Sequence, residues 1–128
     1  MGVVDHKIDA IIVCIQNNFT KQITLKELSE ACEVNYCYLS SVFKKKVGVS
    51  FPKYVKSLRI KSAQALLKEG LKEIKEVAYE SGDKSLTHFY IDFKSYVGMS
   101  PKEYIRINHE VLIQNYVEKI ERKLKESK

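Results

Sequence analysis

FKKKVGVSFPKY, at residues 43–54, returns fifty residues later as FKSYVGMSPKEY, at residues 93–104. Phe, Lys, Val, Gly, Ser and Tyr fall at matching places, which indicates two copies of one structural unit within the chain. Two copies of a small basic unit are typical of a protein that binds a periodic ligand. Duplex DNA is the obvious ligand of that kind.

The composition indicates an ordinary folded protein. The chain has 128 residues, of which 45% are hydrophobic and 30% charged, which is enough to form a core if the two copies pack together. The longest apolar run, at residues 11–15, is far too short to cross a bilayer, and no signal peptide is evident. Its three cysteines form no CxxC pair. We therefore expect a cytoplasmic protein with neither a membrane partner nor a disulfide framework.

The positive charge is concentrated around the first copy. The net charge is +6, and residues 21–60 carry eight Lys or Arg against three Glu, whereas residues 61–110 carry eight residues of each sign. This distribution suits a polyanionic ligand, although a basic face is also common on plain solvated surface. Charge alone leaves both readings open.

Helical periodicity predicts an all-α fold, because no alternating strand pattern persists. Thr24 and Glu27 have capping-box spacing, and Asn35 is a plausible N-cap. Helices are expected at about 4–18, 24–32 and 36–47, the last ending at Gly48. The short turn at residues 33–35 makes the second and third helices a helix-turn-helix.

The second copy repeats this plan. Ser50 is expected to cap a long connecting helix, and Ser100 to cap the last one. About seven helices are predicted in all. They form a first helix-turn-helix subdomain at 4–49, a linker helix at 50–69, a second helix-turn-helix subdomain at 70–107 and a C-terminal helical extension at 108–128. Within the second subdomain, helices are expected near 74–81 and 85–97.

A helical wheel separates a buried stripe from an outward face in the second helix of each unit. The buried stripes are predicted as Leu39, Val42, Phe43 and Val47, and as Phe89, Phe93, Tyr96 and Val97. In a helix-turn-helix the outward face enters the major groove, with lysines best placed for phosphates. The candidate DNA-contacting residues are Tyr36, Cys37, Tyr38, Ser40, Ser41, Lys44 and Lys45 in the first unit, and Thr87, His88, Tyr90, Ile91 and Lys94 in the second.

These residues resemble the DNA-binding domain of the AraC/XylS family of bacterial transcription regulators. The resemblance covers about residues 8–106 and rests on ITLKEL at 23–28, YLSSVFKK at 38–45, Arg59 with LL at 66–67, and the segment 89–104 with its GMSP. It implies two helix-turn-helix units, joined by one long helix, in successive major grooves. It also implies a ligand-sensing or phosphorylation-receiving domain outside this chain, and RNA polymerase as a further candidate partner.

Several residues depart from that family's pattern. Glu33 stands where the first turn often has Gly, so a positive φ there would be strained. Asp92 replaces an apolar residue at the edge of the core. Ser41 and Ile91 each replace a frequent Arg, which removes the side chain that reads guanine most strongly.

Other residues allow more than one interpretation. For Arg59 we favour an internal ion pair that ties the subdomains together over DNA contact, and we expect Lys46 to be a solvated charge at a helix end. The apolar residues of the tail after Arg106 fall at near-heptad spacing. That tail could dimerise, dock on another domain or pack back on the second unit, and we favour packing back.

A rival hypothesis is a helical protein-interaction module that does not bind DNA. It requires an exposed apolar stripe, which only the tail supplies. An enzyme is the weakest hypothesis, because the sequence has no Gly-rich phosphate loop, no zinc-ligand spacing and no Cys-His pair at a recognisable interval. We therefore expect no catalytic residues, no cofactor and no metal site.

Overall fold

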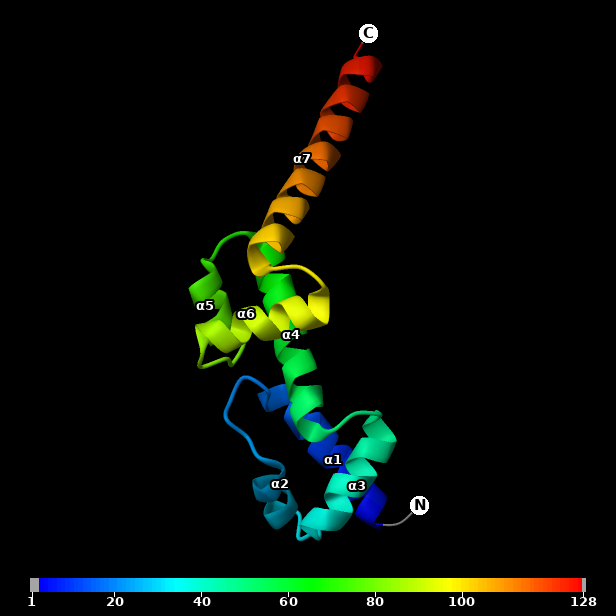
Figure 1. Ribbon diagram of the computed structural model, residues 1–128. Coiled ribbons are helices and arrows are strands. Elements are labelled where there is room, and N and C mark those ends of the chain that lie inside the picture. Colours follow the sequence, from blue (N-terminus) through cyan, green and yellow to red (C-terminus); the bar gives the residue numbers. More distant parts are fainter. Residues whose placement is uncertain (1–2, 128) are drawn as a thin grey trace.

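The computed structural model describes residues 3–127, and within that range the chain forms seven α-helices (Figure 1). This agrees with the predicted all-α class and helix order. Each predicted helix is present with its ends displaced by no more than about one residue. The helices are α1 (Val3–Asn18), α2 (Leu25–Ala31), α3 (Tyr36–Val47), α4 (Phe51–Glu69), α5 (Ile74–Glu80), α6 (Leu86–Val97) and α7 (Pro101–Glu126).

Short polar side chains start four of these helices. The Thr24 hydroxyl accepts a hydrogen bond from the Glu27 amide at 3.1 Å, and the Asn35 side chain accepts one from the Tyr38 amide at 3.0 Å. Ser85 and Ser100 cap α6 and α7 in the same way. Ser50 is at the predicted position before α4, but its side chain makes no capping hydrogen bond, so that part of the prediction is wrong.

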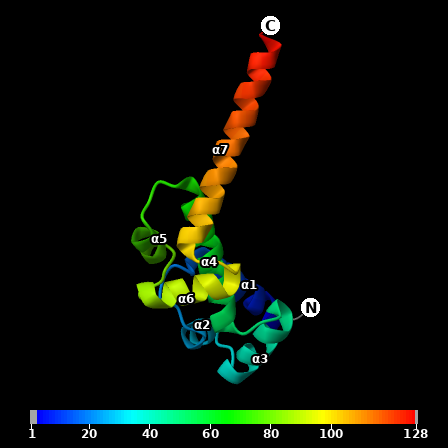
Figure 2. The same cartoon turned by 45° about the horizontal axis from the view of Figure 1, so that its top comes forward.

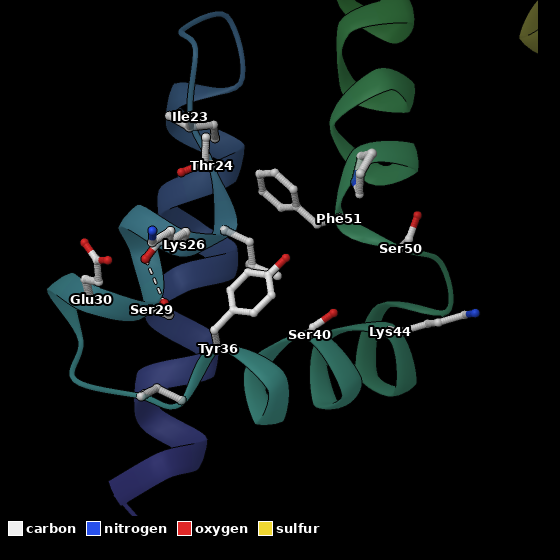
Figure 3. A pocket seen from close by; sticks show the side chains of 13 residues that line it. Ile23, Thr24, Lys26, Ser29, Glu30, Tyr36, Ser40, Lys44, Ser50 and Phe51 are labelled. Carbon is white, nitrogen blue, oxygen red and sulfur yellow. Dashed lines mark hydrogen bonds between the residues drawn. The ribbon is translucent and has the colours of Figure 1, made fainter.

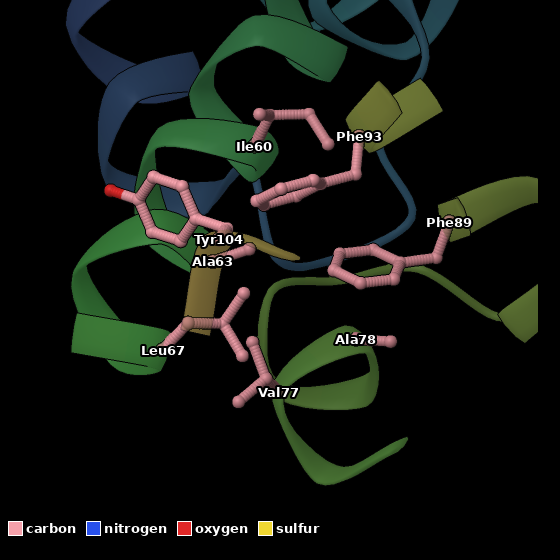
Figure 4. Packing of buried hydrophobic residues seen from close by; sticks show 8 residues of the cluster. All are labelled: Ile60, Ala63, Leu67, Val77, Ala78, Phe89, Phe93 and Tyr104. Atoms are coloured by element: carbon pink, nitrogen blue, oxygen red, sulfur yellow. The ribbon is translucent and has the colours of Figure 1, made fainter. Parts of the chain in front are cut away.

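Two hydrophobic cores lie along α4. One joins α1, α2 and α3 to Val55, near the start of α4. The other joins α5, α6 and α7 to Ile60, Ala63 and Leu67, further along α4 (Figure 4). The connecting helix is therefore a structural part of both cores. With 19 residues it is roughly 28 Å long at 1.5 Å per residue.

The internal repeat is visible in the packing of aromatic rings. Phe43 meets Tyr54 edge to face, with centroids 5.6 Å apart and planes at 70°. Fifty residues on, Phe93 meets Tyr104 at 5.5 Å and 75°. Since α3 and α6 each use the equivalent Phe to pack on the next helix, the two copies place these helices in equivalent local settings.

A polar clamp joins the first unit to the second. Arg59, from α4, donates from Nε to the Phe19 carbonyl at 2.7 Å and from Nη2 to the Lys21 carbonyl at 3.0 Å. The predicted ion pair at Arg59 is thus replaced by hydrogen bonds to backbone carbonyls, because the α1–α2 connection passes within reach of the guanidinium. The prediction that Arg59 makes an internal tie is confirmed.

The turn between α5 and α6 completes this clamp. Gly82 has φ +98°, and a Cβ atom at this position would lie 2.8 Å from Thr20 Cα and 2.9 Å from both Thr20 O and Arg59 Nε. Gln22 also donates to the Gly82 carbonyl at 3.3 Å. The second helix-turn-helix is therefore seated directly on the α1–α2 connection of the first, which limits how the two units can move relative to each other.

Two packing predictions are wrong. Tyr96 was expected in the core but is 44% exposed, with its hydroxyl donating to the Lys53 carbonyl at 3.4 Å. The tail was expected to fold back, but α7 continues as one straight helix away from the body (Figures 1 and 2), and residues 109–127 are all exposed. A single helix running out of Ser100-Pro101 has no turn at which it could reverse direction.

Across residues 3–127 no helix combines the length and apolar character that crossing a bilayer requires.

Candidate nucleic-acid interface

The predicted outward face of α3 lies at the surface. All seven candidate residues of this helix are exposed, whereas Leu39 and Phe43 on the opposite side are fully buried. Val42 and Val47, predicted as buried, are partly buried. The amphipathic pattern of residues 36–47 therefore fixes which side of α3 can meet a ligand.

This face has two parts. Tyr36, Ser40 and Lys44, spaced four residues apart, lie along one edge of a hollow of about 700 Å³ between α2, α3 and the start of α4. Figure 3 shows the Tyr36 ring beside this hollow and the Lys44 side chain extending away from it. Cys37, Tyr38, Ser41 and Lys45 line no part of this hollow. The outward face of α3 therefore has one edge that borders the hollow and another that lies outside it.

The three lysines at the end of α3 differ in their surroundings. Lys46 is exposed in the last turn of α3, as expected, and it also forms an ion pair with Asp9 of α1. Within residues 3–127 neither Lys44 nor Lys45 has an ion-pair partner. Two uncompensated ammonium groups therefore remain at this end of the face.

The α6 face is similar but more varied. Thr87, His88 and Lys94 are exposed, and Ile91 is 61% exposed, which is high for an isoleucine. Tyr90 is only partly buried, and its ring packs edge to face on Phe89 at 6.3 Å. Four of the five candidates are thus fully at the surface, and Tyr90 is the least available.

Lys44 and Lys94 have the same place in their helices. The C-cap glycines Gly48 and Gly98 are left-handed, with φ of +93° and +90°, and donate their amides to the carbonyls of Lys44 and Lys94 respectively. Both lysines also follow a fully buried Phe. The repeat therefore presents one ammonium group at an equivalent point in each unit.

Two exposed apolar residues beside this second face were not among the predicted site residues. Tyr79 in α5 is 80% exposed and Leu86 in α6 is 41% exposed, and both line a hollow of about 420 Å³ between these helices. The repeat contained a signal for Leu86, because it lies fifty residues after Tyr36. It contained none for Tyr79, because α2 and α5 match at an offset of 49 residues, which makes the exposed Glu30 its counterpart.

The charged residues between the units are engaged with the protein. Burial lowers the pKa of the Arg59 guanidinium, and the charge of Asp83 acts in the opposite direction. The group still stays protonated at neutral pH. Asp92, at the edge of the core, lies 3.8 Å from Lys56 of α4. Asp92 therefore has a charge partner where the family's usual residue is apolar.

Comparison with known proteins decides the family. A family pattern described as a helix-turn-helix domain matches residues 28–107, which include α3 to α6 in full. This chain belongs to the AraC-type helix-turn-helix family. It is an AraC-type DNA-binding domain of a transcription regulator.

Individual relatives agree with this assignment. The melibiose operon regulatory protein of Escherichia coli K12 is 29% identical over 96 residues, which are 75% of this chain and 32% of that protein. The chain thus spans about a third of the length of this relative.

Two solved structures share the fold. The DNA-binding domain of AdpA, in complex with a target DNA, has a TM-score of 0.74 and 19% identity over 79% of this chain and 91% of its own. An AraC-type transcriptional regulator from Chromobacterium violaceum has a TM-score of 0.72 and 21% identity, and the match covers 82% of this chain and 94% of that one.

This AraC-type domain carries backbone strain at one of its departures from the family pattern. Glu33, in the turn between α2 and α3, has φ +55°, and within residues 3–127 no other residue except glycine has a positive φ. The sequence-based concern about this position is confirmed. The turn keeps its left-handed geometry because the Val34 amide donates to the Ser29 carbonyl at 2.9 Å.

Proposed function

We propose that α3 and α6 enter successive major grooves on one side of a DNA duplex, and that the domain recognises a specific sequence in this way. The observation that carries the proposal is the equivalent placement of exposed residues on the two helices: Cys37 and Thr87, Ser41 and Ile91, Lys44 and Lys94. The polar clamp supports it, because two helices that are fixed relative to one another can match the roughly 34 Å repeat of the major groove.

The contacts divide into two kinds. Lys44, Lys45 and Lys94 bind phosphates, because their flexible ammonium groups lie toward the ends of the helices. Tyr36, Cys37, Tyr38, Ser40 and Ser41 on α3, and Thr87, His88, Tyr90 and Ile91 on α6, lie closer to the bases. Ile91 can contact a thymine methyl group. Since neither helix offers an arginine, bidentate reading of guanine by these faces is not expected.

The domain works within a larger regulator. Its chain spans about a third of its curated relative, so we infer a sensor or receiver domain elsewhere in the protein. We further propose a cytoplasmic location and RNA polymerase as a partner on DNA. The domain makes no covalent change to the DNA that it binds.

Paired lysine substitutions test the groove assignment. Lys44→Ala and Lys94→Ala should each weaken binding to all sequences and reduce the slope of log K against log salt by about one unit. Lys46→Ala is the matched control, because this ammonium group is already paired with Asp9. Substituting Tyr38, Ser41, Thr87 or His88 should instead change which base is preferred. Unchanged binding of all these variants to cognate and random DNA would show that the wrong face has been assigned.

A further inference from the structure

The outer part of α7 exposes an apolar surface that DNA binding leaves unexplained. From Ile107 onward it exposes eight large apolar side chains, and no other helix of the described residues packs on its last five turns. Contiguous exposed apolar surface of this kind marks an interaction site. The eight residues are Ile107, Val111, Leu112, Ile113, Tyr116, Val117, Ile120 and Leu124.

Four of these residues form a regular seam. Ile113, Val117, Ile120 and Leu124 are separated by four, three and four residues, which is the spacing of the core positions of a coiled coil. At 100° per residue they fall within a sector of about 60°. Val111 lies on the far side of the helix, roughly 160° away. We propose that this seam pairs two copies of the chain through antiparallel α7 helices.

The charges favour a second copy as the occupant. Residues 108–127 carry four Glu and four Lys or Arg, so two such helices do not repel each other. A helix that bound nucleic acid, or a strongly charged partner, would be expected to carry an excess of one sign. The seam also matches itself. A two-fold axis between residues 118 and 119 sets Ile113 opposite Leu124 of the other copy, and Val117 opposite Ile120.

The seam favours the antiparallel orientation. Glu110 occupies the next core position toward the body, and a parallel pair would set it against Glu110 of the other copy. An antiparallel pair sets it beside Ser127 instead. Moreover, Leu124 is at an a position and both isoleucines are at d positions, a combination that disfavours parallel pairs of two strands. Lys123 then flanks Tyr116 of the other copy, where a cation–π contact can form.

The size of the contact predicts a weak dimer. A seam over residues 110–127 is about 26 Å long, and the pair buries on the order of 1,000 Å², below the usual size of stable interfaces. Association should therefore depend on protein concentration, and increase when both copies are held on one DNA molecule. The two DNA-binding bodies lie at opposite ends of the helix pair, so paired DNA sites should be inverted repeats.

Sedimentation equilibrium of the complete 128-residue chain tests the proposal. The apparent mass should rise from 14.8 kDa toward twice that value as the concentration is raised a hundredfold into the millimolar range. Ile120→Lys should raise the dimer dissociation constant by about tenfold or more. Val111→Lys, at a residue of similar exposure (52% against 59%), should leave it nearly unchanged. Circular dichroism of both variants checks that α7 stays helical.

Orientation is read from a spin label at position 126, in a chain whose three native cysteines are replaced by Ser. In the antiparallel pair the two labelled positions are about 22 Å apart along the axis, whereas in a parallel pair they lie side by side. A monomer at every concentration, equal weakening by both lysine variants, larger oligomers, or labels side by side would each overturn the proposal. DNA binding to a single site should be the same for both variants, so it reports on the proposed function separately.

Discussion

Replacing Gly82 with alanine tests whether the second helix-turn-helix is seated on the first. The new methyl group would lie 2.8 Å from Thr20 Cα and 2.9 Å from Thr20 O. Both are backbone atoms, so they cannot rotate away as a flexible side chain can. The third close atom, Arg59 Nε, is held by its hydrogen bond to the Phe19 carbonyl. The substitution therefore has to push the α5–α6 turn away from the α1–α2 connection.

Two terms give the expected cost. A left-handed conformation costs an alanine about 1–2 kcal/mol relative to right-handed backbone. Overpacking against a fixed neighbour costs a further 1–3 kcal/mol or so. The free energy of unfolding should then fall by about 2–5 kcal/mol, which for a chain of this size lowers the melting temperature by roughly 10 °C or more.

Gly98→Ala is the matched control. Gly98 has φ +90°, close to the +98° of Gly82, but no atom lies within 4 Å of its added Cβ. Only the cost of left-handed backbone applies to this variant, so its free energy of unfolding should fall by about 1–2 kcal/mol. Both variants and the parent are compared by urea unfolding followed by circular dichroism. Equal losses for Gly82→Ala and Gly98→Ala would refute the close approach of the two units.

Three further substitutions are tested by the same urea unfolding. Glu33→Gly should stabilise the domain by about 0.5–1 kcal/mol, because glycine relieves the strain at φ +55°. The greater freedom of glycine in the unfolded chain offsets part of that gain. Glu33→Ala, the control, should bring no gain. Ser81→Ala should be neutral or stabilising by up to about 1 kcal/mol. The reason is that Ser81 Oγ is fully buried and has no hydrogen-bond partner within residues 3–127. A clear loss of stability would contradict this prediction. Arg59→Lys should lower the free energy of unfolding by about 1–3 kcal/mol, because one ammonium group cannot replace both guanidinium hydrogen bonds to the Phe19 and Lys21 carbonyls. An unchanged urea midpoint would argue against the polar clamp.

Helix positions were predictable because their signals are local. Thr24, Asn35 and Gly48 act within one turn of the residues that they cap, so spacing in the sequence is enough to place them. The repeat was also readable, because the same Phe and Tyr serve the same contact in each unit. The outward faces of α3 and α6 followed from periodicity alone, whereas their contacts with DNA remain proposals.

Long-range contacts were not predictable in the same way. The position of Tyr96 depends on where α6 crosses α4, which a helical wheel does not specify. The partners of Arg59 come from the path of a loop that carries no regular pattern. Lys46 pairs with Asp9 of α1, 37 residues earlier in the chain, and sequence spacing does not reveal that contact. The four residues that depart from the AraC family's pattern were visible in the sequence, but only the structure shows that Asp92 lies near Lys56.

Hydroxyl-radical and methylation footprints on a selected high-affinity DNA site can show where α3 and α6 each lie on the duplex. If both helices insert at once, two major-groove segments on one side of the duplex should be protected, about one helical turn of 10–10.5 base pairs apart. Lys44→Ala should reduce protection mainly in one of these segments, and Lys94→Ala mainly in the other. Protection of a single groove, or of two segments on opposite sides of the duplex, would contradict simultaneous insertion of α3 and α6.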